Sequence, residues 1–128
     1  MGDTVYIVAP ALEESNQILD ALSSTDFQLR TFDTAEALLA ELAATCGCVL
    51  VPADLPGMGV RGLIEEIRRQ QLDIAVVVIG RDRDLSTAVD LVRAGAVDFL
   101  EHPMNVRRLR SVVRRVISAA RAAAGHPR

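Results

Sequence analysis

Short apolar runs alternate with helix-period segments from one end of this chain to the other. The runs at residues 5–8, 27–32, 48–51, 75–79 and 97–100 are rich in β-branched and aromatic residues, which predicts strands. In the longer segments between and after them, apolar residues recur every three or four positions, which predicts amphipathic helices. Five strands alternating with five helices indicate right-handed β-α-β crossovers and a parallel sheet covered on both faces.

Capping residues and helix breakers set the expected boundaries. Thr34 is a good N-cap for the second helix, and Asp84 or Ser86 could cap the fourth, which Gly95 would end. Pro52 should end the third strand, because proline cannot donate to a central ladder. Residues 52–62 hold two prolines and three glycines and are expected to form a loop. The helices are expected at residues 12–22, 35–44, 63–70, 85–94 and 106–123.

Two open sheets of this kind are common, the flavodoxin-like and the Rossmann-like. Five βα units favour the flavodoxin-like one, a three-layer (βα)5 fold with strand order 2-1-3-4-5. Its functional edge is formed by the carboxyl ends of strands 1, 3 and 4. The chain has the length of one domain, which we place at residues 1–120. The Ala/Arg-rich residues 121–128 are expected to be a tail or the start of a linker.

Charge is distributed unevenly around a net charge of −3. All seventeen acidic residues lie at or before Glu101, whereas seven of the fourteen arginines follow Pro103. Residues 1–103 therefore carry a net −10 and the remainder +7. The apolar runs are far shorter than the ~20 residues that span a bilayer, and no basic leader precedes them. These features predict a cytoplasmic protein.

Two segments carry a family resemblance: "LPGM" at residues 55–58 and "TAVDLVRAGAVDFLEHP" at residues 87–103. They resemble the CheY-like receiver domains of bacterial response regulators, particularly receivers fused to transcriptional output domains. The resemblance covers residues 4–118 and implies a signalling module rather than an enzyme. It also implies a dimerisation or partner-docking face built from the fourth helix, fifth strand and fifth helix. The residues expected on or near that face are Arg93, Asp98, Phe99 (the family's rotameric switch), Arg107, Arg110 and Arg114.

The resemblance also assigns the phosphorylation site, and each position is replaced in this chain. The family carries an acceptor aspartate after its third strand, an acidic Mg²⁺-binding pair after the first, a hydroxyl after the fourth and a lysine after the fifth. Here Ala9 and Pro10 replace the acidic pair, and Pro52 replaces the acceptor. Gly80 replaces the hydroxyl residue, and His102 replaces the lysine. The resemblance therefore implies a degenerate pseudo-receiver that acts without phosphorylation, metal or cofactor. A histidine also titrates near neutrality, so a pH-sensitive role for His102 stays open.

Two other functions remain open at the same edge. Asp54 lies two residues after Pro52 and could serve as a displaced acceptor, which would make the chain a true phospho-accepting receiver. Alternatively, a mouth lined by Ala9, Pro10, Pro52 and Gly80 is smaller and less polar than a Mg²⁺ pocket. It could accept an apolar small molecule.

Two short motifs are weaker signals. Residues 57–62 match the G-x-G-x-x-G dinucleotide fingerprint, with Asp82 about twenty residues later. However, the motif follows the third strand rather than the first, and residues 52–56, with two prolines, precede its first glycine. Cys46 and Cys48 share one face of a strand, yet without further ligands this pair predicts a loop residue and a small core residue. We therefore favour neither nucleotide binding nor a metal or redox site.

Arginines form a stripe on the last helix, at Arg107, Arg110, Arg114 and Arg121, with Arg108 and Arg115 beside it. Direct binding of nucleic acid is disfavoured, because the rest of the chain is acidic and offers few aromatic residues for stacking. The stripe is instead expected to be a solvated face, an intersubunit salt-bridge surface or a basic lead into an output domain.

Overall fold

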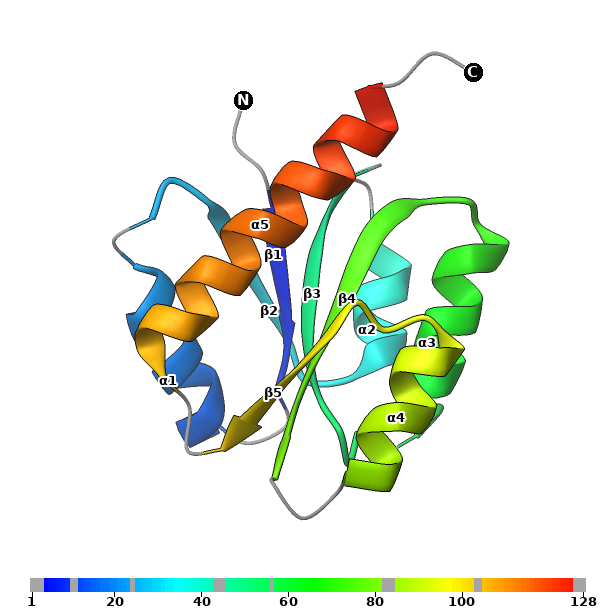
Figure 1. Ribbon diagram of the computed structural model, residues 1–128, viewed down its shortest axis with the longest axis horizontal. Coiled ribbons are helices and arrows are strands. Elements are labelled where there is room, and N and C mark those ends of the chain that lie inside the picture. The colour runs from blue at the N-terminus through cyan, green and yellow to red at the C-terminus, as the bar shows by residue number, and fades with distance from the viewer. Residues whose placement is uncertain are drawn as a thin grey trace.

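The computed structural model describes residues 4–9, 12–23, 25–42, 46–55, 57–81, 85–102 and 105–125. Strands and helices alternate along the chain (Figure 1). The strands are β1 (Thr4–Val8), β2 (Gln28–Phe32), β3 (Cys46–Pro52), β4 (Asp73–Arg81) and β5 (Asp98–His102). The helices are α1 (Leu12–Leu22), α2 (Ala35–Glu41), α3 (Gly59–Arg69), α4 (Leu85–Ala94) and α5 (Val106–Gly125).

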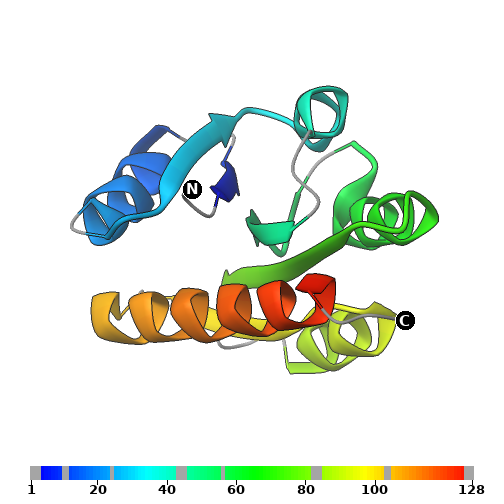
Figure 2. The ribbon, with the colours of Figure 1, turned by 90° about the horizontal axis from the view of Figure 1, so that it is seen from above.

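The five strands form one parallel sheet with the order β2-β1-β3-β4-β5. This confirms the predicted flavodoxin-like fold and its strand order. In Figure 1, α5 crosses one face of the sheet and α2 lies behind it, and Figure 2 shows α5 running alongside β4. Within the described ranges, every helix is too short or too polar to cross a membrane.

Two hydrophobic cores hold the layers together, one on each face of the sheet. Successive residues of a strand point to opposite faces. Val5 and Ile7 therefore pack in the core under α1 and α5, while Tyr6 and Val8 pack in the core under α2, α3 and α4. The continuous apolar runs of the sequence thus correspond to strands buried on both faces.

The predicted loop at residues 52–62 is wrong in its second half, because α3 begins at Gly59 rather than at residue 63. Its buried positions include Val60, Ile64 and Ile67, which recur at helical spacing. The glycines and prolines outweighed this periodicity in the sequence, although Val60 already belonged to the apolar face of the helix.

Other boundaries differ by smaller amounts. The Thr34 cap is confirmed, since its Oγ1 accepts a hydrogen bond from the Ala37 N–H at 3.0 Å. However, α2 ends at Glu41 and Leu42 is extended, so the expected end at residue 44 is too late. Ser86 lies inside α4 and is not its N-cap, whereas Asp84 lies outside the described residues.

The C-terminal ends of α4 and β3 agree with the sequence. Gly95 ends α4 with a φ of 131°, and its N–H donates to the carbonyl of Leu91 at 3.1 Å. Pro52 is the last residue of β3 and pairs with Ile79 of β4. The pairing of β3 with β1 stops earlier, at Leu50, so the missing N–H of the proline falls where that ladder has ended.

The end of α3 stores strain that a substitution can release. Gln71 adopts a φ of 57°, in the left-handed region that favours glycine. Its N–H donates to the Arg68 carbonyl and that of Leu72 to the Ile67 carbonyl, which is the Schellman arrangement. Gln71→Gly should therefore raise the free energy of unfolding by about 0.5–1 kcal/mol, measured by urea denaturation. Gln70→Gly is the matched control: Gln70 has a right-handed φ of −82°, so this change should not stabilise. A Gln71→Gly variant no more stable than the wild type would contradict the prediction.

Candidate functional site

The carboxyl ends of β1, β3 and β4 meet at one edge of the sheet, at the bottom of Figure 1. Ala9, Pro52 and Gly80 lie there and all three are buried. The Ala9 N–H donates to the Phe32 carbonyl at 3.0 Å, which continues β1 by one bond toward β2. None of the three residues offers a side-chain nucleophile or a side-chain oxygen to a metal.

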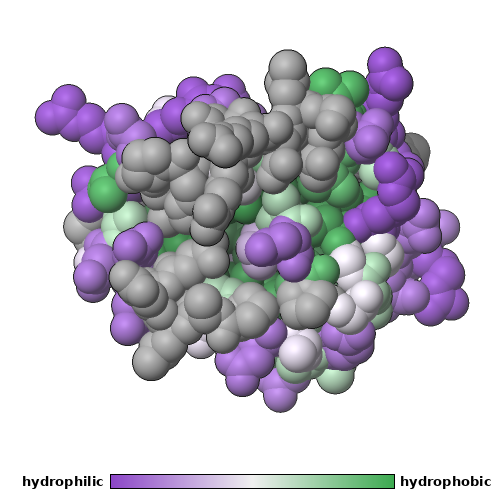
Figure 3. Space-filling model, turned by 90° about the horizontal axis from the view of Figure 1, so that it is seen from below, coloured by the Kyte–Doolittle hydropathy of each residue, from purple (hydrophilic) through white to green (hydrophobic). Residues whose placement is uncertain are grey.

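Figure 3 looks onto this edge from below and shows, beside the grey atoms, apolar residues near the centre with a hydrophilic residue among them and further hydrophilic residues around the rim. Pro10 lies outside the described residues, and of His102 only its backbone, as the last residue of β5, is described. In the described part of the chain, no group of three or more His, Cys, Asp or Glu residues is placed to hold a metal ion.

Gly80 is covered by an aromatic ring. A Cβ built on Gly80 would lie 2.5 Å from Cζ of Phe99 and 3.0 Å from Cβ of Ala53. Phe99 is half-buried and packs against the core under α2, α3 and α4. The space that a side chain at position 80 would need is therefore already filled.

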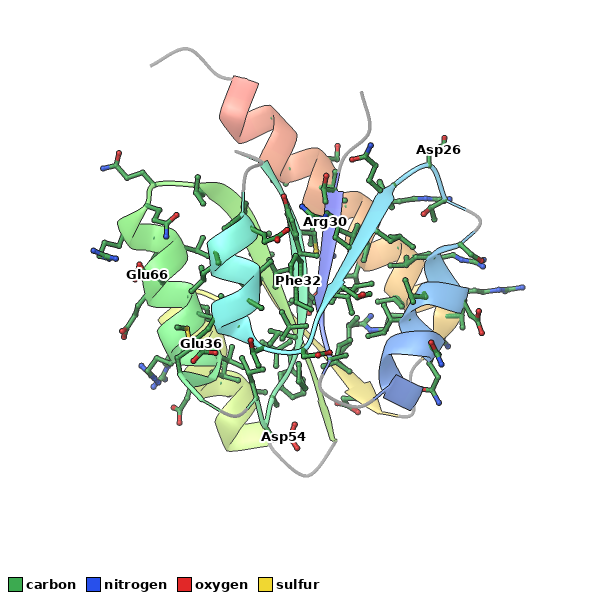
Figure 4. The ribbon with its side chains drawn as sticks, turned by 180° about the vertical axis from the view of Figure 1, so that it is seen from behind. Asp26, Arg30, Phe32, Glu36, Asp54 and Glu66 are labelled. Atoms are coloured by element: carbon green, nitrogen blue, oxygen red, sulfur yellow. The ribbon has the colours of Figure 1, made fainter. Side chains whose placement is uncertain are left out.

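Asp54 follows β3 in a turn and is exposed. The turn is closed by a hydrogen bond from the Leu55 N–H to the Pro52 carbonyl, at 3.2 Å. In Figure 4, Asp54 lies at the lower margin of the molecule, beyond the end of β3. Asp54 therefore lies at the same edge of the sheet as Ala9 and Gly80, but it is exposed whereas those two residues are buried.

Asp98 connects β5 to α5, on the face of the sheet opposite to the one on which Phe99 packs. Its Oδ2 lies 2.6 Å from Nη2 of Arg115, and its Oδ1 accepts the Phe99 N–H at 2.8 Å. Spacing on the helix places Arg108 on the same side of α5 as Arg115. The arginine that pairs with Asp98 is thus Arg115. The sequence had placed Arg115 beside the main stripe of arginines and not within it.

The main arginine stripe faces elsewhere. Arg110 is half-buried, and its Nε donates to the Ala21 carbonyl at 2.7 Å, at the end of α1. Because Arg107 and Arg114 lie three and four residues away, they share this side of α5, and both are exposed. Of the residues expected on the contact face, Asp98 and Phe99 thus lie on opposite sides of β5, and Arg110 is directed toward α1. Arg121 has no described side chain.

Exposed valines mark α4 and the start of β5. Val89, Val92 and Val97 are 42%, 47% and 53% exposed. Ala88, Val89 and Val92, with the exposed Arg93, line a shallow hollow of about 360 Å³. Sequence reasoning missed these valines, although two of them recur at helical spacing beside the buried Leu91. Val89 and Val92 thus give the described part of α4 an exposed apolar surface.

The glycine-rich segment does not form a phosphate cradle. Gly57 and Gly59 have φ values of 75° and 73° and turn the chain into α3. A Cβ built on Gly57 would lie 3.0 Å from Oε2 of Glu36, so a carboxylate stands beside the first glycine. A negative charge there opposes the binding of a pyrophosphate. Asp82 lies outside the described residues.

Cys48 is a core residue, as predicted. It is fully buried, and burial raises the pKa of its thiol from 9.0 to about 12. The thiolate, which is the reactive form, is therefore suppressed in the folded protein. The side chain of Cys46 lies outside the described residues.

The Cys48 thiol should make stability depend on pH above neutrality. In the unfolded chain the thiol ionises near its ordinary pKa of 9.0, whereas in the folded protein it keeps its proton up to about pH 12. The stabilisation is complete below pH 9, and the free energy of unfolding should then fall by up to ~1.4 kcal/mol per pH unit as the pH rises. Urea denaturation of the wild type and Cys48→Ala between pH 8 and 10.5 isolates this term. Parallel curves for the two proteins would refute it.

Comparison with known proteins places this geometry in a family. Residues 10–114 match the response regulator receiver domain. The transcriptional regulatory protein FixJ of Bradyrhizobium diazoefficiens is 29% identical over 121 residues, covering 94% of this chain and 59% of the relative. The response regulator protein TodT of Pseudomonas putida is 26% identical over 124 residues, covering 93% of this chain and 53% of the relative.

Solved structures agree with the sequence matches. Full-length FixJ from B. japonicum superposes with a TM-score of 0.87 at 28% identity, covering 95% of this chain and 61% of that one. NtrX from Brucella abortus, crystallised with ADP, gives a TM-score of 0.84 at 26% identity, covering 97% of this chain and 29% of that one. This chain therefore spans less than two thirds of each of these relatives. From its fold and from the match over residues 10–114, the chain belongs to the response regulator receiver domain family.

Proposed function

We propose that this domain is a pseudo-receiver, a regulatory module of a two-component-type response regulator that acts by protein contact and not by accepting a phosphoryl group. The observation that carries the proposal is the chemistry of the sheet edge. Phosphoryl transfer to a receiver needs a carboxylate nucleophile, a Mg²⁺ ion to offset the charge of the incoming group, and donors to its oxygens. In the register implied by the family resemblance, Pro52 supplies no nucleophile, Ala9 no metal ligand and Gly80 no hydroxyl.

Asp54 offers little as a replacement acceptor. Its carboxylate is exposed in the turn after β3, and Ala9, which directly follows β1, is a buried residue with no ligand oxygen in its side chain. A carboxylate without Mg²⁺ ligands beside it lacks the charge compensation that a second anion requires. A small-molecule site at this edge gains no support either, since Phe99 and Ala53 already fill the space beside Gly80.

The surface that we assign to contact is the one formed by α4, β5 and α5, and the occupant that we propose is a second copy of this chain. The exposed valines of α4 supply apolar area, and Arg93 supplies a cation at its margin. Exposed apolar patches bordered by polar residues mark interaction sites. The longer relatives include a transcriptional regulatory protein, which supports the further proposal that the domain serves a C-terminal output domain in the cytoplasm.

Incubation with acetyl phosphate and Mg²⁺, followed by intact-mass measurement, tests the loss of phosphorylation. We expect no adduct of about 80 Da, the mass of one phosphoryl group, under conditions that label a phospho-accepting receiver run in parallel. An adduct that disappears in Asp54→Ala would make the chain a true receiver with a displaced acceptor. Sedimentation at several concentrations, with and without the phosphodonor, tests the contact. We expect a dimer whose stability does not change with the phosphodonor.

A further inference from the structure

We infer that Gly80 and Phe99 form a fixed lock in this chain: the glycine leaves room for one inward position of the ring, and the ring occupies it. In consequence the contact surface beside β5 is held in one state. That consequence rests on the proposed function, whereas the lock itself rests on packing alone.

The steric argument is specific to position 80. Carbon atoms in contact lie about 3.5–4.0 Å apart, yet a Cβ on Gly80 would lie 2.5 Å from Cζ and 3.2 Å from Cε2 of Phe99. Any residue other than glycine would therefore displace the ring. Ala53 closes the same space from β3, with its Cβ 3.0 Å from that position.

Sheet register explains how the ring reaches the glycine. Phe99 pairs directly with Val78, and Gly80 lies two residues further along β4, on the same face as Val78. The ring therefore leans along the strand to the diagonal neighbour, which is within the reach of an aromatic side chain. A side chain at position 80 would occupy the place that the ring takes beside Gly80.

The backbone of Phe99 is restrained from the other face of the sheet. Asp98 accepts the Phe99 N–H at 2.8 Å and holds Arg115 of α5 at 2.6 Å. The bond between Asp98 and the Phe99 N–H lies within β5 and would move with the strand, whereas the ion pair with Arg115 of α5 opposes a slide of β5 that would accommodate a displaced ring. The ring would have to rotate outward, where the half-exposed Phe99 borders solvent beside the α4 surface.

A double-mutant cycle tests the lock. Gly80→Ala should lower the midpoint of thermal unfolding by roughly 5–10 °C, because the new methyl group collides with the ring. In a Phe99→Leu background the same change should cost less than half as much, since the ring atoms that make the closest contacts are gone and only the contact with Ala53 remains. Phe32→Leu is the matched control: Phe32 is also a half-buried phenylalanine, but it lies on β2, at the far edge of the sheet (Figure 4). In that background Gly80→Ala should cost as much as in the wild type.

The lock can also be tested in the wild type, without any variant that has to fold. We expect nuclear Overhauser effects between the Phe99 ring protons and the Gly80 α protons. Equal costs of Gly80→Ala in all three backgrounds, or absence of these effects, would overturn the lock.

Sedimentation of Gly80→Ala tests the consequence, and we expect a dimer dissociation constant raised about tenfold (about 1.4 kcal/mol). If the cost of Gly80→Ala depends on Phe99 but Gly80→Ala leaves the dimer dissociation constant unchanged, the link between the lock and the contact surface is overturned. If the cost of Gly80→Ala depends on Phe99 but the wild type stays monomeric at every concentration, the lock is supported and the proposed dimer is excluded.

Discussion

Val92→Asp is expected to abolish self-association of the domain, raising the dimer dissociation constant at least ~100-fold, about 2.7 kcal/mol. Val92 is 47% exposed beside Val89 and lines the α4 hollow, so a second copy seated there would bury it. Association would then lose apolar contact and would bury a carboxylate without a matched partner. Sedimentation velocity across a hundredfold range of protein concentration measures the change.

Val106→Asp is the matched control. Val106 is 44% exposed, nearly as much as Val92. It lies in the first turn of α5, at the margin of the proposed contact surface, on the side where α1 lies and away from the α4 hollow in which the second copy is seated (Figure 1). The same chemical change there should leave the dissociation constant within about twofold. Equal disruption by both variants would mean that the effect is not specific to α4. A wild type that remains monomeric at every concentration would remove the second copy as the occupant of this surface.

The sequence was sufficient for the fold because both of its periodicities are undisturbed. Strand runs such as residues 75–79 are buried on both faces and contain no break, and α5 keeps its apolar positions over its first three turns. Where two signals conflict, the sequence misleads. In residues 59–62 the glycine content indicates a loop, whereas the spacing of Val60 with Ile64 indicates a helix, and packing against the sheet decides for the helix.

The candidate site was predictable in part. The burial of Ala9 and Gly80 follows from their places at strand ends, so the apolar character of the edge was visible in the sequence. The contact of Phe99 with Gly80 was not, because it depends on the register of β4 and β5 and on one rotamer. Helical spacing assigned Arg110 and Arg115 to different sides of α5, and their contacts agree with that. It could not show that Arg110 reaches α1 while Arg115 reaches β5, since that depends on where α5 lies on the sheet.

Gly47→Ala is expected to be strongly destabilising, lowering the free energy of unfolding by about 3 kcal/mol. Gly47 lies in β3 between β1 and β4, where it pairs with Thr4 and Ile74. A Cβ at this position would lie 2.7 Å from the carbonyl oxygen of Thr4. Because that atom belongs to the backbone of a neighbouring strand, relief requires β1 and β3 to separate. Urea denaturation gives the value.

Gly47 and Gly80 are both buried strand glycines, but the atoms with which a new Cβ would collide differ. At Gly80 the obstacle is the ring of Phe99, so Phe99→Leu should relieve a Gly80→Ala change; at Gly47 it is main chain, so Phe99→Leu should leave the cost of Gly47→Ala unchanged. A Gly47→Ala protein as stable as the wild type would show that β1 can yield at Thr4. On this account the residue between Cys46 and Cys48 is glycine because two backbones approach closely there. The glycine of the Cys-Gly-Cys sequence is thus explained by strand packing, and Cys48 beside it is a buried core residue.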